Sequence, residues 1–108
     1  GDYARAHPLA QRALAIWETA HGPEHPDVAT SLNNLAGLYW EMGDLARAEP
    51  LYERSLAIWE KALGPEHPNV ATSLNNLALL YQAMGDDVRA GPLFERSLAI
   101  WERSASTD

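Results

Sequence analysis

The sequence predicts an all-α fold, an α-solenoid of five helices made from one half repeat and two full repeats of antiparallel helix pairs. Residues 22–63 and residues 64–105 match at 31 of 42 positions. Residues 1–21 match residues 43–63, the second half of that unit, at 14 of 21 positions. Within each unit, apolar residues recur at spacings of three and four, which is typical of helices that bury one face. Repetition on this scale indicates stacked helical units that complete their cores against neighbours.

The first helix of each full repeat is expected to begin at His25-Pro26 and to run to about Met42. Proline is favourable at a first helical position, because the hydrogen-bond donor that it lacks has no partner there. Gly43 can end the helix in a left-handed conformation, and Asp44 follows as an N-cap. The apolar stripe of this helix contains Leu32, Leu35, Ala36 and Tyr39.

The second helix is expected from about Leu45 to Leu63, where Gly64-Pro65 stops it. Its stripe contains Ala48, Leu51, Tyr52, Ser55, Leu56 and Trp59. The next repeat carries the same signals at Pro68, Leu74, Leu77, Ala78, Tyr81, Gly85, Asp86, Ala90, Leu93, Phe94 and Leu98. The chain is therefore divided into the second helix of a partial repeat at 1–21, full repeats at 22–63 and 64–105, and a polar tail at 106–108.

A proline lies inside the second helix of every repeat, at Pro8, Pro50 and Pro92. Each removes a backbone hydrogen bond and favours a kink. Because the proline recurs at the same place, we interpret it as a built-in bend. The alternative is a second helix that begins near Pro50, although the helical spacing of Ala48 and Tyr52 favours the longer helix.

Composition argues against several classes of function. The chain has 15 acidic and 8 basic residues, a formal net charge of −7, so phosphate backbones and anionic membranes are disfavoured partners. No segment approaches the ~20 apolar residues of a membrane span, and no secretory signal is visible. The absence of cysteine fits a reducing compartment, and we expect a cytoplasmic location.

No pattern in the sequence indicates catalysis, and we expect neither enzymatic activity nor a cofactor. The chain lacks a nucleophile with a base at useful spacing and a phosphate-binding glycine loop. Acidic and basic residues alternate on the second helices and are interpreted as a solvated face with ion pairs within each helix. The members of this face are Glu18, Glu53, Glu60, Glu95 and Glu102, with Arg12, Arg54, Lys61, Arg96 and Arg103.

Histidines and tryptophans recur with the repeat. His25 and His67 each follow a glutamate, but equivalent histidines one repeat apart are too distant to share one metal ion, since packed helices lie ~8–10 Å apart. We therefore expect no metal site, and a capping or loop role for both. Tryptophans recur at Trp17, Trp59 and Trp101 and could form a ligand ladder, but we expect them to pack in the interior, together with Tyr52 and Phe94.

The run LNNLAGLYWEMGDLARAEPLYERSLAI resembles a tetratricopeptide repeat. The positions that carry the resemblance are Leu35, Ala36, Tyr39, Gly43, Ala48, Tyr52 and Ser55. Where that family usually has a proline near the repeat end, this chain has Glu60 and the helix continues. The 42-residue form, with LNNLA, AEPLY and a G-x-x-HP-x-VA loop, looks like the kinesin light chain type. The resemblance implies a right-handed solenoid that binds protein partners and says little about which ones.

In that family, extended peptides bind along a concave groove lined by the first helix of each repeat. Carried onto this chain, the groove residues are Thr30, Asn33, Asn34, Gly37, Trp40 and Glu41, and in the next repeat Thr72, Asn75, Asn76, Leu79, Gln82 and Ala83. Asparagine suits a groove because its amide both donates and accepts hydrogen bonds. The alternative is that Asn34 and Asn76 tie neighbouring helices together.

Three of the differences between the two full repeats fall on the predicted groove, Gly37/Leu79, Trp40/Gln82 and Glu41/Ala83. Selection for a partner would produce this pattern, although free drift of exposed positions would as well. The groove positions carry no Lys or Arg, so clamps for a carboxylate or for acidic cargo do not transfer. We therefore expect an extended neutral or basic peptide as the partner.

A second reading is a structural spacer or a self-associating array. The first and last helices are each expected to expose a face meant for a neighbour, so copies could stack head-to-tail.

Overall fold

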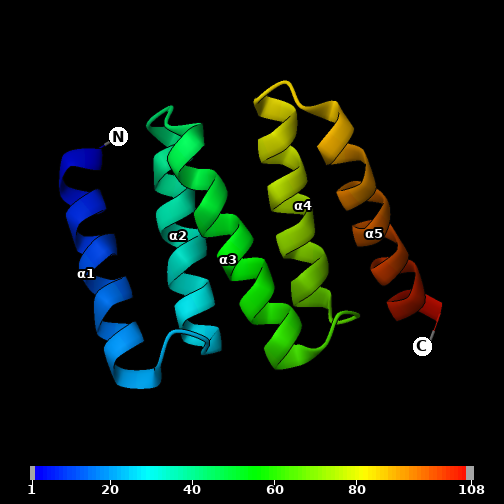
Figure 1. The fold of residues 1–108 in the computed structure, drawn as a ribbon, viewed down its shortest axis with the longest axis horizontal. Helices are drawn as coiled ribbons and strands as arrows, with labels where there is room; N and C mark the ends of the chain where they lie inside the picture. The colour runs from blue at the N-terminus through cyan, green and yellow to red at the C-terminus, as the bar shows by residue number, and fades with distance from the viewer. Residues whose placement is uncertain (1, 107–108) are drawn as a thin grey trace. The chain divides into compact units, whose positions relative to one another are not determined.

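The structure is a computed structural model that describes residues 2–106, all of whose regular elements are helices (Figure 1). They are α1 (Tyr3–His21), α2 (Pro26–Glu41), α3 (Leu45–Leu63), α4 (Pro68–Ala83) and α5 (Asp87–Ser106). The predicted all-α array of antiparallel helix pairs is confirmed. Of the predicted polar tail, Ser106 is the last residue of α5, whereas residues 107 and 108 lie outside the described residues, as does residue 1 of the partial repeat.

Packing divides the chain into two compact units, called here unit 1, which ends at Ile58, and unit 2, which begins at Trp59. In unit 1, α1 lies beside α2, and in unit 2, α4 lies beside α5 (Figure 1). The division falls inside α3, which contributes to both units. The repeat boundaries at 22–63 and 64–105 therefore remain a proposal about the organisation of the sequence.

The ends of the helices follow the local signals in the sequence. Gly43 has φ +83°, and its N–H donates to the carbonyl of Trp40 while the N–H of Asp44 donates to that of Tyr39. This pair of bonds is a Schellman motif, which satisfies carbonyls at the end of α2. Helix α3 runs unbroken through Pro50 from Leu45, so the alternative start near Pro50 is wrong.

The core of unit 1 lies between the apolar stripe of α2 and the buried face of α3. The predicted stripe of α2 is buried, with Val28, Ala29 and Ser31 in addition. On α3 the buried residues are Ala48, Tyr52, Ser55 and Ile58. The predicted α3 stripe was partly wrong, because Leu51, Leu56 and Trp59 are only half-buried and Ile58 was not included.

A buried serine joins the two helices of each pair. In unit 1 the Ser55 hydroxyl donates to the carbonyl oxygen of Ala29 over 3.0 Å, and in unit 2 that of Ser97 donates to Ala71 over 2.8 Å. Both are buried, so each hydroxyl has a partner as its burial requires. The core of unit 2 resembles that of unit 1, except that Leu80 is buried where Leu38 is half-buried. Its apolar members are Val70, Ala71, Leu74, Leu77, Ala78, Leu80, Tyr81, Ala90 and Ile100.

The charged face contradicts one sequence-based expectation. Glu18 on α1 pairs with Arg54 on α3 at 2.8 Å, and Glu60 pairs with Arg96 on α5 at 2.7 Å. We call α1, α3 and α5, the second helices of the repeats, second-type helices. These ion pairs join two second-type helices rather than neighbouring turns of one helix, because the long arginine side chain spans the gap between them. Arg103 likewise pairs with Glu66 in the loop before α4.

The expectation that the repeated tryptophans are interior is also wrong for two of them. Trp17 and Trp101 are 38% and 45% exposed, and Trp59 is half-buried. Phe94, expected in the core, is half-buried, whereas Tyr52 is buried as expected. An indole is buried only where another element covers its face of the helix. Within its own unit, Trp17 instead stacks on the ring of His21.

Candidate functional site

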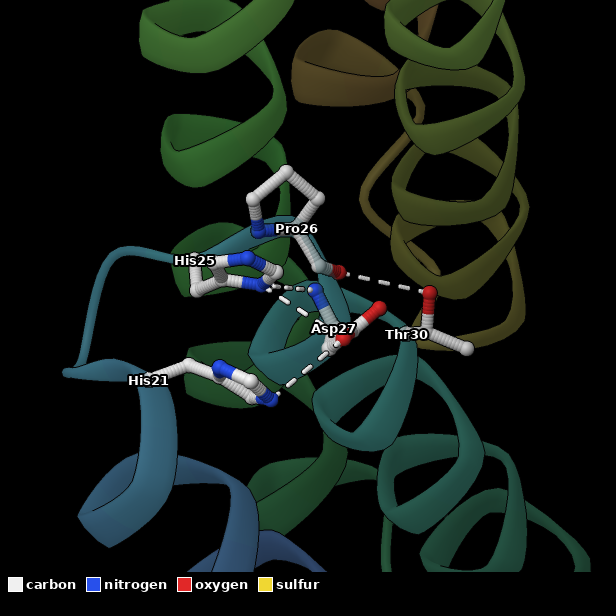
Figure 2. Close-up of polar contacts among 5 residues, drawn as sticks. All are labelled: His21, His25, Pro26, Asp27 and Thr30. Atoms are coloured by element: carbon white, nitrogen blue, oxygen red, sulfur yellow. Dashed lines mark hydrogen bonds and ion pairs between the residues drawn. The ribbon is translucent and has the colours of Figure 1, made fainter.

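The N-terminal ends of α2 and α4 are built by the repeated His-Pro pair. The Nδ1 atom of His25 accepts a hydrogen bond from the backbone N–H of Asp27 over 3.0 Å (Figure 2). The Nδ1 atom of His67 accepts one from the backbone N–H of Asn69 over the same distance. The capping role predicted for both histidines is thus confirmed. Histidine is an uncommon cap, and it acts here because its Nδ1 lone pair replaces the usual side-chain oxygen.

A small polar cluster surrounds the first of these caps. The carboxylate of Asp27 lies 3.6 Å from His25 and 3.8 Å from His21, and the two imidazole rings stack with centroids 4.5 Å apart (Figure 2). Among residues 2–106, no group of three or more His, Cys, Asp or Glu side chains has the arrangement of a metal site. The Nδ1 lone pair of His25 already accepts the N–H of Asp27, so it serves as a helix cap in this cluster.

The predicted groove residues form one surface on α2 and another on α4, the first helices of the two full repeats, which we call first-type helices. We call Thr30, Asn33, Asn34, Gly37, Trp40 and Glu41 the α2 face, and Thr72, Asn75, Asn76, Leu79, Gln82 and Ala83 the α4 face. Every member is exposed or half-buried, although the residues between them in sequence are mostly buried. Each helix therefore leaves the predicted positions accessible while its other side packs into the core.

The threonines and asparagines of these faces differ in how far they are already bonded. Thr30 donates its hydroxyl to the carbonyl of Pro26 over 3.3 Å, so its remaining capacity is as an acceptor (Figure 2). Within unit 1, Asn34 makes no side-chain hydrogen bond, and the Oδ1 atom of Asn33 is buried without a partner. Asn76 is likewise unbonded within unit 2, so the alternative role of tying helices has no support inside either unit.

Four residues in the C-terminal part of the α2 face and on the adjoining α3 are grouped here under the name notch: Gly37, Trp40, Glu41 and Tyr52. The Trp40 and Tyr52 rings meet edge to face, with centroids 6.3 Å apart and planes at 85°. A Cβ atom placed on Gly37 would lie 3.8 Å from the Tyr52 hydroxyl, an ordinary van der Waals contact and the one contact it would make beyond its chain neighbours and the adjacent backbone of α2. Burial, and secondarily the nearby charge of Glu41, raises the pKa of Tyr52. The notch is thus lined by one indole, one phenol and one carboxylate.

Tyr52 is the residue of this site that the sequence did not reveal. Its place in the apolar stripe of α3 predicted a core role, and the ring is indeed buried. The hydroxyl nevertheless lies beside Gly37 on the α2 face. The one available signal was that Tyr52 is replaced by Phe94 in the next repeat, together with the three groove differences.

Comparison with known proteins decides the family. The tetratricopeptide repeat family model matches residues 1–58 and residues 27–103. The chain belongs to the tetratricopeptide repeat (TPR) family. Proteins of this family are generally non-enzymatic scaffolds for protein interactions. No curated protein matches the chain.

Solved structures agree with this assignment. BtubC (BKLC) from P. vanneervenii is 33% identical with a TM-score of 0.88, over 94% of this chain and 40% of that one. A Podosopora anserina protein described as a kinesin light chain with nearly identical TPR-like repeats is 34% identical with a TM-score of 0.87, over 96% of this chain and 49% of that one. The resemblance to kinesin light chain-like TPR arrays is thus confirmed. This TPR chain spans less than half the length of either structure.

No helix in the described part of this TPR chain is both long and apolar enough to cross a membrane.

Proposed function

We propose that the chain is a protein-interaction scaffold that binds an extended neutral or basic peptide against the α2 and α4 faces. The observation that carries the proposal is that all twelve residues of these faces are accessible on helices whose other sides form the core. An extended peptide has unpaired backbone N–H and C=O groups, and unbonded asparagine amides such as that of Asn34 can satisfy both kinds. Trp40 is of a residue type enriched in binding hot spots.

The charge of the chain favours this class of partner over others. Neither face contains a Lys or Arg, and the net charge of −7 disfavours nucleic acids, anionic membranes and acidic peptides. The proposal includes a cytoplasmic location, without a cofactor or a catalytic step.

A peptide array screened with the full chain tests the proposal. Trp40→Ala and Asn34→Ala should each weaken binding of the selected peptides by about tenfold, the effect of a hot-spot residue worth more than ~1 kcal/mol. Gln11→Ala, at an exposed position of α1, serves as the control that leaves binding unchanged. Peptides that bind equally well to both face variants would show that the groove lies elsewhere.

Head-to-tail self-association is a second candidate, which exposed apolar side chains favour. On α1, Leu9 and Ile16 are each 61% exposed, and Ile16 lines a shallow hollow with Ala15, Thr19 and Ala20. On α5, Leu98 is 58% exposed. Contact between α1 of one copy and α5 of another would be heterologous and could propagate. Sedimentation should then show concentration-dependent mass that Ile16→Glu abolishes, and a strict monomer at high concentration would exclude it.

A further inference from the structure

The notch on the α2 face gathers three kinds of group that attract a cation. Gly37, Trp40 and Glu41 occupy positions i, i+3 and i+4 of α2, so they share one side of the helix. The Tyr52 hydroxyl reaches the same place from α3, next to Gly37. An indole face attracts cations through its quadrupole, a carboxylate through its charge, and a phenol oxygen as a hydrogen-bond acceptor.

The Trp40 and Tyr52 rings contact each other edge to face, but the Glu41 carboxylate and the Tyr52 hydroxyl have no polar partner among the described residues. No basic side chain of the described residues forms a salt bridge with Glu41, which is exposed. The nearest basic residue along the chain, Arg47, pairs instead with Asp44. The Tyr52 hydroxyl has no hydrogen bond to any residue in the range 2–106. Trp40 is half-buried, so part of its indole remains open to solvent.

Unit 2 lacks every one of these features at the equivalent positions. There the notch residues are replaced by Leu79, Gln82, Ala83 and Phe94, which together contain no charge, no indole and no hydroxyl. The two full repeats differ at eleven positions, and four of those eleven are the four notch residues. The glycine, the hydrogen-bond acceptors and the charge that unit 2 lacks all belong to this single site. The remaining positions of the two helix pairs are nearly identical.

We propose that the notch binds a basic side chain, lysine or arginine, of the extended peptide. This inference rests on the proposed function and narrows it from a neutral or basic peptide to one that places a cation at the α2 face. A neutral side chain would gain no charge attraction from the Glu41 carboxylate, and an acidic one would be repelled by it. The chain contains a contact of the same kind in unit 2, where the Arg89 guanidinium lies 4.2 Å from the centroid of the Tyr81 ring.

The test compares paired peptides by fluorescence polarisation. Each peptide selected in the array is made with Lys, Arg or Gln at one position in turn, and is titrated with the full chain. At one position, the Lys or Arg form should bind about 3- to 30-fold more tightly than the Gln form, the range expected of cation–π contacts. The preference should weaken at high salt, because part of it comes from the exposed Glu41 carboxylate.

The variant G37L/W40Q/E41A/Y52F provides the decisive comparison. It places in unit 1 the side chains that the same helix pair carries in unit 2, and the space around Gly37 accepts a Cβ atom. Circular dichroism checks that its helices remain. The preference for Lys over Gln should disappear in this variant. The control is D27N, which copies Asn69 of the other repeat and also removes one negative charge, and in it the preference should persist.

The outcomes separate this inference from the proposed function. Two results would refute binding of a basic side chain at the notch while leaving the scaffold function intact. One is that peptides bind with no preference for Lys or Arg, and the other is that the preference survives in the variant with all four substitutions. If no peptide binds, the proposed function fails, and an NMR titration with Nα-acetyl-lysine amide decides the notch alone. The indole N–H signal of Trp40 should shift with this probe and not with Nα-acetyl-glutamine amide. No shift at millimolar probe would refute the site.

Discussion

Breaking the ion pair between Glu18 and Arg54 should destabilise the protein by a small amount that depends on salt. The two charged atoms are 2.8 Å apart, and the side chains are 33% and 38% exposed. Coulomb's law gives about 1.5 kcal/mol at that distance in bulk water and about 6 kcal/mol at an effective dielectric constant of 20. Solvent screening and lost rotamer freedom reduce this, so we expect a coupling of about 0.5–1 kcal/mol, the upper range for exposed pairs.

A double-mutant cycle measures the coupling. Glu18→Ala, Arg54→Ala and the double variant are compared by urea unfolding, which separates the pairwise interaction from the effects of each side chain. Arg54 also donates to the carbonyl of Pro23 over 3.3 Å, so its substitution should cost more than that of Glu18. The pair Glu60–Arg96 has similar distance and exposure and provides an independent repeat of the measurement.

Salt provides the second part of this test. At 1 M ionic strength the screening length falls to about 3 Å, so the coupling should decrease markedly. A coupling of zero at low salt in both pairs would refute the view that these bridges stabilise the contact between second-type helices. A coupling that is unchanged at high salt would show that packing, rather than charge, is responsible.

Three further predictions concern the core, a helix end and pH. Leu74 is fully buried, so Leu74→Ala should lower the free energy of unfolding by about 2–5 kcal/mol. Leu98 is exposed, so Leu98→Ala should change that free energy by no more than about 0.5 kcal/mol. Urea unfolding midpoints measure both effects. Gly43→Ala forces a side chain into φ +83°, which should lower the free energy of unfolding by about 1–2 kcal/mol and lower the Tm measured by calorimetry. The control Ala57→Gly, at an exposed helical position, should lower the free energy of unfolding by no more than about 1 kcal/mol. Burial, then the charge of Glu41, raises the pKa of Tyr52 above 10.0, so the folded chain holds this proton where the unfolded chain releases it. Stability is therefore fully present below pH 10.0 and is lost as pH rises from there through the folded pKa; Tyr52→Phe should flatten this loss, and an unchanged alkaline profile would contradict the assignment.

Much of the fold could be predicted because its signals are local. The proline at Pro26, the glycine at Gly43 and the spacing of apolar residues each act within one or two turns of chain, and the observed bounds of α2 and α3 follow them closely. The accessibility of the predicted groove positions also follows from helical periodicity, since one stripe of each first-type helix enters the core.

The features that the sequence left undetermined depend on which helix lies over which face. Trp17 and Trp101 share the sequence context of Trp59 but are exposed, because burial of an indole requires a covering element that periodicity within one helix does not specify. Glu18 and Arg54 are 36 residues apart and meet only because α1 and α3 lie close enough for an arginine to span them.

In Tyr52, the sequence determined one property of the side chain and the tertiary structure determined another. Its position in the helical stripe was sufficient to predict a buried ring, since that depends on the direction of one face of α3. The approach of its hydroxyl to Gly37 depends on how α3 packs against α2. Helical periodicity already puts Trp40 and Glu41 on the same side of α2 as Gly37, and only the tertiary structure could bring the phenol to them.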